Sequence, residues 1–324
     1  MSEIEEKQLH WADEKEVIKS NKPLLLLFLL MKHFPNFVVY ILIFPIAFFY
    51  FVCSKRARTE CILYQKNLKS YTKGCSPKRI SAFKQILSFS LCVMEKMEGW
   101  LGNIKYDKII CHDDDLNELK SSLENKKGAL LIGSHLGNIE LLRSLSSFGE
   151  HGVSHAIPVT TIMELKATEM FNRTLHEINP EVDINVINPT DINPDTIIKL
   201  QETIEKGGLV VIAGDRTSAR ARDRFIRTDF LGNQADFPYG VFLIAALLKC
   251  PVYFCFGLRN KTVTLFPKYH MFVERSKVIF DCSRKEREQR IEELCDEFVR
   301  NLEKFCERFP FQWYNFYNFW LLRN

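Results

Sequence analysis

The stretch ALLIGSHLGNIELLRSL, residues 129–145, indicates the fold class of the chain. It begins as a continuous apolar run, which is typical of a strand buried on both faces of a parallel sheet. It breaks at Gly133–His135 and resumes at Asn138 with the apolar spacing of a helix. A strand that passes into a helix through a short turn is the repeating unit of α/β folds.

The same alternation continues along the chain. Strands are expected at 108–112, 129–134, 153–159, 183–187, 208–214 and 251–258, with one or two more within 262–273. Helices are expected at 116–125, 138–148, 164–177, 194–206, 238–249 and 288–309, and 56–98 reads as helical with a break near Gly74–Pro77. These elements predict an α/β layered domain with a mainly parallel sheet flanked by helices.

Composition limits the possible functions. The chain has 324 residues and a formal net charge of only +4, which does not indicate nucleic-acid binding. The ten cysteines are scattered without a C-x-x-C pair. That pattern predicts reduced thiols in a reducing cytoplasm rather than disulfides or a zinc site.

The N-terminal region predicts membrane association. Residues 23–53 are apolar except for Lys32 and His33, and the uncharged part, 37–53, is short for a bilayer span and contains Pro45. We expect a tilted helix or a hairpin in one leaflet; a buried soluble helix is the alternative. The basic residues of SKRAR, 54–58, place the rest of the chain on the cytoplasmic side. The predicted division is therefore a membrane anchor at 1–55, with N-terminal membrane-associated helices, and a globular domain at 56–324.

His135 comes directly after a predicted strand, where ligands of open α/β sheets collect. Glu140 lies five positions later, which on a continuous helix would separate the two side chains by about 140°. They can meet only if His135 lies in the turn before the helix. Gly137 permits such a turn, and Asn138 can cap the helix. A carboxylate on one imidazole nitrogen prepares the other nitrogen to act as a general base.

The nucleophile is expected to come from the substrate. Ser134 precedes the histidine but lacks the G-x-S-x-G context of a serine nucleophile. A hydroxyl group of the substrate is the most natural alternative.

The H-x4-E motif in GSHLGNIE, 133–140, resembles that of the lysophospholipid acyltransferase superfamily, and more narrowly the lipid A late acyltransferases. Three further blocks resemble the same family in the same order: VVIAGDRTS (210–218), FLGNQADFPYGVFLIAALLKCPV (230–252) and RFPFQWYNFYNFW (308–320). The chain departs from relatives in two places. It carries G-D-R-T at 214–217 where the glycerolipid branch has E-G-T-R, and Val241 where relatives often have proline.

The resemblance implies a membrane-bound O-acyltransferase in the bacterial inner membrane, with its catalytic domain on the cytoplasmic face. The acyl group would come from a thioester on acyl carrier protein or CoA and pass to a lipid or glycolipid hydroxyl, without a metal or cofactor. His135 would be the general base and Glu140 its partner. Asp215 and Arg216 would position the acceptor or stabilise developing negative charge, and Asn138 is assigned to substrate binding.

Other interpretations stay open. The same dyad could serve a hydrolase, or the protein could bind lipid without catalysis. The arginines of 216–227 could meet an anionic ligand or simply be solvated. CHDDD, 111–115, reads better as a capping turn than as a metal site. The aromatic residues of 313–320 fit either an acyl groove, the membrane interface or the core.

Overall fold

The computed structural model describes most of the chain. The described residues are 29–30, 33–34, 36–100, 108–112, 114–142, 153–163, 185–216, 224–264 and 266–320. The predicted helix at 164–177 therefore lies outside the described residues.

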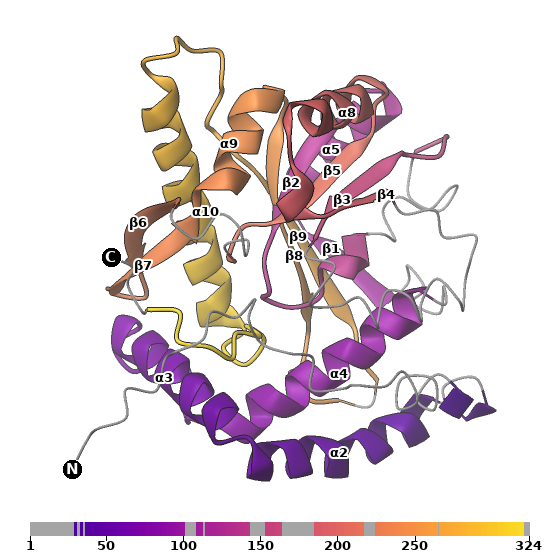
Figure 1. Cartoon of the computed structure of the whole chain (residues 1–324). Helices are drawn as coiled ribbons and strands as arrows, with labels where there is room; N and C mark the ends of the chain where they lie inside the picture. Colours follow the sequence, from indigo (N-terminus) through magenta and orange to yellow (C-terminus); the bar gives the residue numbers. More distant parts are fainter. Residues whose placement is uncertain are drawn as a thin grey trace.

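A seven-stranded sheet forms the centre of the fold (Figure 1). Its strands, in spatial order, are β1 (Ile109–His112), β9 (Tyr269–Arg275), β8 (Val252–Arg259), β2 (Ala129–Gly133), β5 (Leu209–Ala213), β3 (Val159–Ile162) and β4 (Asn185–Ile187). All neighbours are parallel except β8 and β9. This confirms the mainly parallel sheet. The bounds of β3 are the weakest prediction, because this strand begins at the residue where the predicted strand ends.

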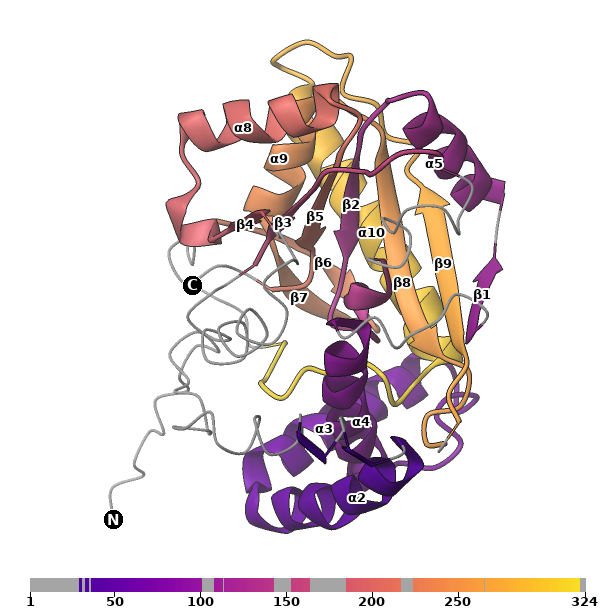
Figure 2. The same ribbon diagram turned by 90° about the vertical axis from the view of Figure 1, so that its right-hand side faces the viewer.

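Helices cover both faces of the sheet (Figures 1 and 2). Along β2, Leu130 and Ile132 join a core with α8 (Pro194–Glu205), α9 (Tyr239–Leu248) and α10 (Arg287–Arg308). The alternate residues Ala129 and Leu131 join a second core with α5 (Asp114–Glu124). Because successive side chains of a strand point to opposite faces, a strand covered on both sides must be apolar throughout.

Local sequence signals place the helix ends. Asn193 caps α8 with a reciprocal bond pair to Thr196, and Pro194 occupies the first turn, where its missing N–H is harmless. α10 buries the apolar stripe that its 3.6-residue spacing predicts. The buried stripe comprises Ile291, Leu294, Cys295, Phe298, Val299, Leu302, Phe305 and Cys306.

Three N-terminal helices lie at one end of the sheet (Figures 1 and 2). They are α2 (Asn36–Cys53), α3 (Lys55–Tyr71) and α4 (Ala82–Trp100), and the break between α3 and α4 falls at the predicted place. α2 continues through Pro45 and packs against α4 through Val39, Ile43 and Ala47. Within the described ranges, no single helix is both long and apolar enough to cross a membrane. Only α2 and α3 counted together, with a 92° bend between them, reach that length and composition.

Two elements differ from the predictions. Strands β6 (Phe225–Phe230) and β7 (Asn233–Pro238) form an antiparallel hairpin that the sequence analysis missed. The predicted helix at 138–148 is described only as a short 3₁₀ helix, η3 (Ile139–Leu142), and the residues from 143 to 150 lie outside the described part. A second short 3₁₀ helix, η4 (Pro189–Asp191), precedes α8. The ten cysteines, all within the described residues, form no disulfide.

Candidate active site

The candidate site lies where two neighbouring parallel strands end. Gly133, the last residue of β2, is in register with Ala213, the last residue of β5. Two residues beyond these ends, His135 and Asp215 therefore lie side by side. Ligands of α/β sheets bind at this edge, so the position agrees with the one predicted for His135.

A buried carboxylate holds His135 in place. The imidazole Nδ1 lies 2.8 Å from Asp215 Oδ1, and the backbone N–H of His135 donates to Oδ2 at 2.9 Å. Trp313 Nε1–H donates to the same Oδ2 at 3.1 Å. An ionised carboxylate can only accept hydrogen bonds, so Nδ1 carries the proton in this pair. The unprotonated nitrogen of the neutral imidazole is then Nε2.

The electrostatic setting keeps His135 neutral and Asp215 ionised. Burial and the positive charge of Arg216 lower the pKa of His135, and Asp215 opposes them only in part. Burial opposes ionisation of Asp215, yet His135 and Arg216 outweigh it and lower the pKa of this carboxyl. The Asp215 side chain is 1% exposed, whereas that of His135 is 32% exposed. The carboxylate is therefore sealed in the protein, and the imidazole has an open edge.

The turn that carries His135 has a fixed shape. Gly137 has a φ of +79°, and a Cβ added there would lie 2.2 Å from the carbonyl oxygen of Gly257. The backbone N–H of Asn138 donates to the same oxygen at 2.7 Å. Ser134 Oγ accepts the N–H of Leu136 at 3.1 Å. Because Ser134 is buried and occupied in the turn, its position agrees with the prediction that it is not the nucleophile.

The C-terminal segment closes over this turn. Gly137 N–H donates to the Gln312 carbonyl at 2.8 Å, and Tyr314 N–H donates to the His135 carbonyl at 2.9 Å. Leu136 and Trp313 form the antiparallel bridge between these bonds. Segment 312–314 thus pairs with the turn as a short additional strand. This pairing brings the Gln-Trp-Tyr sequence near the C-terminus into contact with the turn that carries His135.

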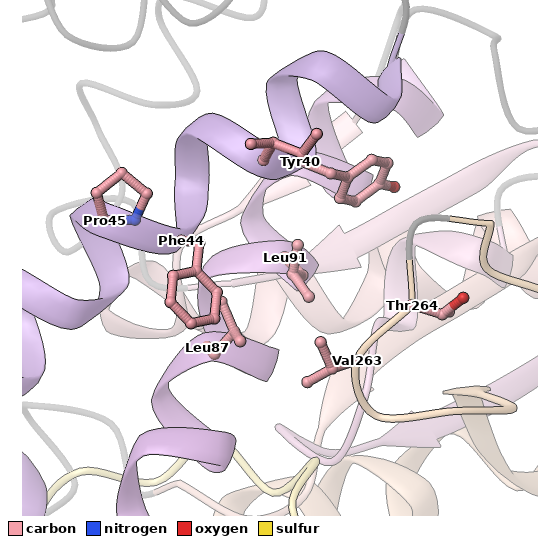
Figure 3. Close-up of a pocket in the computed structure, with 8 residues that line it drawn as sticks. Tyr40, Phe44, Pro45, Leu87, Leu91, Val263 and Thr264 are labelled. Carbon is pink, nitrogen blue, oxygen red and sulfur yellow. The ribbon is translucent and has the colours of Figure 1, made fainter.

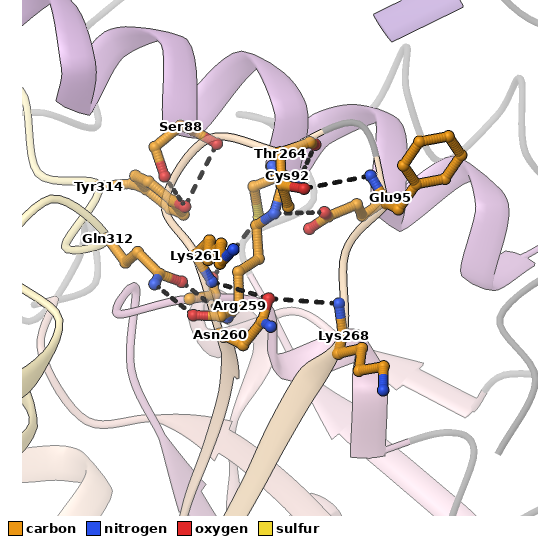
Figure 4. A network of polar contacts seen from close by, with 12 residues as sticks. Ser88, Cys92, Glu95, Arg259, Asn260, Lys261, Thr264, Lys268, Gln312 and Tyr314 are labelled. Atoms are coloured by element: carbon orange, nitrogen blue, oxygen red, sulfur yellow. Dashed lines mark hydrogen bonds and ion pairs between the residues drawn. The ribbon is translucent and has the colours of Figure 1, made fainter. Parts of the chain in front are cut away.

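The same segment is tied to the sheet and to α4. The side chain of Gln312 accepts the N–H of Arg259 and donates to its carbonyl, both at 2.9 Å. Figure 4 shows this bond pair beside the contact between Arg259 Nε and Glu95 on α4, at 2.9 Å. Burial raises the pKa of Glu95 to about 7, although Arg259 opposes this. The network joins α4, β8 and the C-terminal segment behind the turn that carries His135.

Arg216 stands next to the His135–Asp215 pair. Its Nη2 donates to the Tyr314 carbonyl at 2.8 Å, and its guanidinium lies 5.9 Å from the centre of the Tyr317 ring. The side chain is half-buried. This position brings a positive charge next to His135, whereas the role of Arg216 toward the acceptor stays a prediction.

The other predicted site residues, Glu140 and Asn138, come shortly after His135 in the chain. The backbone of Glu140 lies in η3, but its side chain is outside the described part, so its pairing with His135 stays a prediction. The acid that contacts His135 is Asp215, which the sequence analysis assigned to the acceptor instead. Asn138 is buried at 2% exposure, and its role in substrate binding also stays a prediction.

Of the remaining candidates, Arg220 and Arg222 lie outside the described residues, and two others make contacts of their own. Arg227 pairs with Asp236 at 2.8 Å on the β6–β7 hairpin. The carboxylate of Asp115 accepts the backbone N–H of Arg275 at 2.8 Å. Among the described residues, no three His, Cys, Asp or Glu side chains are grouped so that they could hold a metal ion. Of the terminal aromatics, Trp313 and Phe319 pack into the main core, which favours the packing interpretation for these two.

An apolar hollow of about 560 Å³ lies on the other side of α4 (Figure 3). Tyr40 and Phe44 of α2, Leu91 of α4 and Val263 line it. Cys92, the residue after Leu91, faces the turn that carries His135, where its Sγ lies 3.6 Å from the Gly137 carbonyl oxygen. Leu91 and Cys92 point about 100° apart on α4, so this helix contacts both the hollow and the His135 turn.

Comparison with known families adds an independent finding. A family model described as bacterial lipid A biosynthesis acyltransferase matches residues 89–322, more than two thirds of the chain. The matched region contains every residue of the candidate site. None of the curated proteins compared with the chain matches it.

Proposed function

Because the chain belongs to the bacterial lipid A biosynthesis acyltransferase family, and is therefore an acyltransferase of lipid biosynthesis, we propose a specific acyl transfer for it. The protein moves an acyl chain from an acyl thioester, carried by acyl carrier protein or CoA, to a hydroxyl of a lipid or glycolipid. His135 acts as the general base, and Asp215 holds it. No metal or cofactor takes part in this scheme.

The reaction begins with the acceptor hydroxyl beside His135 Nε2. As Nε2 takes the proton, the oxygen attacks the thioester carbonyl and a C–O bond forms. The carbon–sulfur bond then breaks, and the thiolate leaves with the proton that the imidazolium returns. Asp215 stabilises the imidazolium between these steps, because it is ionised and accepts the Nδ1–H.

Arg216 supplies the positive charge that this scheme needs. Negative charge develops on the thioester oxygen during attack, and a fixed donor beside that oxygen lowers the barrier. The hydrogen bond from Arg216 to Tyr314 holds the guanidinium next to the histidine before substrate arrives. A site arranged in advance does not have to reorganise when charge develops.

The outer face of α2 supports membrane attachment. Eight large apolar residues of this helix are exposed: Phe37, Ile41, Leu42, Phe44, Ile46, Phe48, Phe49 and Val52. Large exposed apolar surfaces are uncommon on soluble monomers and mark sites of contact with a partner or a membrane. We propose that this face lies in the cytoplasmic leaflet of the bacterial inner membrane, where the lipid acceptor resides.

The observation that carries the proposal is the hydrogen-bonded pair of His135 and Asp215 at the sheet edge, with Nε2 left as the base. Purified protein in lipid vesicles, supplied with an acyl thioester and a lipid acceptor, should form an acylated lipid detectable by mass spectrometry. His135→Ala should lose this activity and keep its fold and vesicle binding. Full turnover by that variant would exclude the role of His135. Release of fatty acid without acceptor would instead favour a hydrolase.

A further inference from the structure

The segment from Lys55 to Lys84 concentrates the positive charge of the chain. It holds nine Lys or Arg residues and one acid, whereas the whole chain has a net charge of only +4. The segment comprises α3, the α3–α4 loop and the start of α4. The rest of the chain must therefore be slightly acidic, and the basic segment stands out as a surface for an anionic partner.

The far end of this segment forms a hollow of about 810 Å³ with the end of α10. Four cations line this hollow: Lys78, Arg79, Lys84 and Arg308. The apolar residues Pro77 and Phe311 are part of its lining, and Glu307 is the acid among the lining residues. We call this feature the basic hollow.

The walls of the basic hollow are held by internal contacts. Ser76 Oγ donates to the Glu307 carbonyl at 2.7 Å, which joins the α3–α4 loop to α10. Lys84 Nζ lies 4.4 Å from the centre of the Phe311 ring, and the Arg308 guanidinium 4.7 Å from that of Phe272. Lys84 and Arg308 therefore lie against different aromatic rings, and their positive charges are set apart in the lining of the hollow. Within the described part of the chain, none of the four cations forms an ion pair with a carboxylate.

The basic hollow extends from the α3–α4 loop to the start of α4. α3 turns by 92° from α2, and Figure 1 shows it rising away from the edge that α2 forms. A helix of 17 residues is about 25 Å long, and charges in physiological salt are screened over about 8 Å. If the apolar face of α2 meets the membrane, Lys55 and Arg56 lie near the headgroups. The lining of the hollow, however, extends to Lys84 at the start of α4, and the neighbouring Phe83 packs against Phe44 and Phe48 of α2. Lipid headgroups are therefore the competing occupant, which the vesicle-binding measurement below distinguishes from a protein.

The basic hollow is also adjacent to the catalytic turn. Phe311 in its wall is followed directly by segment 312–314, which pairs with the His135 turn. Three residues of extended chain span at most about 11 Å. Gln85, the residue after Lys84, donates to the Trp313 carbonyl at 2.6 Å. A partner bound in the hollow would therefore lie close to His135.

We propose that the basic hollow docks an acidic face of the protein that carries the acyl thioester. The inference rests on the proposed function and selects a carrier protein over CoA as the donor. Cations spread over a wide, partly apolar hollow match several carboxylates on a protein surface better than one phosphate group. Such charge pairs at an interface mainly raise the association rate and make it dependent on salt.

The test uses the full chain in vesicles, with a charge-reversed variant, Lys78→Glu/Arg79→Glu. The donors are a long-chain acyl group on acyl carrier protein and the same acyl group on CoA. The matched control, Arg284→Glu/Lys285→Glu, also reverses two positive charges. These residues come just before α10, whose other end lines the hollow, and that helix is about 33 Å long. We expect the hollow variant to raise KM for the carrier-protein donor at least tenfold. Its kcat, its use of acyl-CoA and the control variant should change less than twofold.

Three results would overturn the docking proposal. Equal impairment with both donors would assign the hollow to CoA, and loss of binding to phosphatidylglycerol vesicles would assign it to headgroups. The third result is an unchanged KM for the carrier-protein donor. If the unmodified protein transfers no acyl group from either donor, the proposed function fails, and fluorescence anisotropy of labelled carrier protein then decides the docking alone. Binding that falls at least tenfold in the hollow variant supports it, and equal binding refutes it.

Discussion

Replacement of Asp215 by asparagine tests whether the buried carboxylate controls the protonation of His135. The carboxylate accepts three N–H groups: the Nδ1–H and backbone N–H of His135, and the indole N–H of Trp313. Asparagine offers one oxygen and one NH₂ group in the same volume. The backbone and indole donors both point at Oδ2 and cannot become acceptors, so the amide oxygen must take that position. The NH₂ group then faces Nδ1 and forces the imidazole proton onto Nε2.

The expected effect is a consequence of this tautomer change. With Nε2 protonated, His135 cannot accept the proton of the acceptor hydroxyl. The same substitution in a catalytic triad lowers kcat by about 10⁴-fold for this reason. We expect Asp215→Asn to lower kcat by roughly 10³- to 10⁴-fold, or about 4 to 5.5 kcal/mol in the barrier. Because size and packing are conserved, the free energy of unfolding should fall by no more than about 3 kcal/mol.

The assay is acyl transfer to lipid acceptor, with thermal unfolding as the control for folding. Glu140→Gln provides the matched comparison, because the sequence assigns to Glu140 the role that the structure gives to Asp215. A variant of Asp215 that keeps more than a tenth of the activity, beside a Glu140→Gln variant that loses 10³-fold, would refute the reasoning. In that case the His135–Asp215 pair would hold the turn without serving the chemistry.

Three further predictions concern the surroundings of the pair. Gly137→Ala should destabilise the fold by at least about 1 kcal/mol and lower turnover about 100-fold. The reason is that alanine must adopt a φ of +79° there, and its Cβ would lie 2.2 Å from the Gly257 carbonyl oxygen of β8. An unchanged melting temperature would contradict this prediction. His135 acts when neutral, so kcat/KM should rise with pH through a pKa below about 6.5. Arg216→Gln should move this limb to higher pH, because the cation lowers the pKa of His135; a limb that stays in place would remove Arg216 from the electrostatics. Trp313→Phe removes one hydrogen bond to ionised Asp215 and should lower the free energy of unfolding by at least about 1.5 kcal/mol in a denaturant titration; wild-type stability would count against that bond.

Elements with uniform burial could be predicted from the sequence. β2 and β5 are covered on both faces, so their apolar runs end where the strands end, and α10 shows its buried stripe at helical spacing. The β6–β7 hairpin was missed because its two-residue turn lacks the usual Asn-Gly signal. Leu231 and Gly232 both have positive φ there. Leucine rarely adopts this conformation, and in this position its N–H donates to Glu303 at 2.7 Å.

The site could be predicted only in part. His135 was found because a polar residue after a buried strand lies at the ligand-binding edge. Its contact with Asp215 was missed, because the two strands that carry them are not consecutive: β3 and β4 intervene in the chain. Spacing along the sequence favours a nearby acid such as Glu140, whereas the register of β2 with β5 sets residues 80 positions apart side by side. Strand order is a long-range property that a single sequence does not reveal.

The hydrogen bonds around Asp215 also determine where the proton goes in the proposed reaction. Protonation of the carboxylate would remove the negative charge that strengthens its three hydrogen bonds to N–H groups, and the pKa of Asp215 is accordingly lowered. The proton taken from the acceptor therefore stays on the imidazole. Burial and Arg216 lower the pKa of His135, so the imidazolium releases its proton readily. It gives the proton to the departing thiolate, whose ordinary pKa of about 8.5 makes it the stronger base. The same features that make His135 a moderate base thus make its conjugate acid an effective donor to the leaving group.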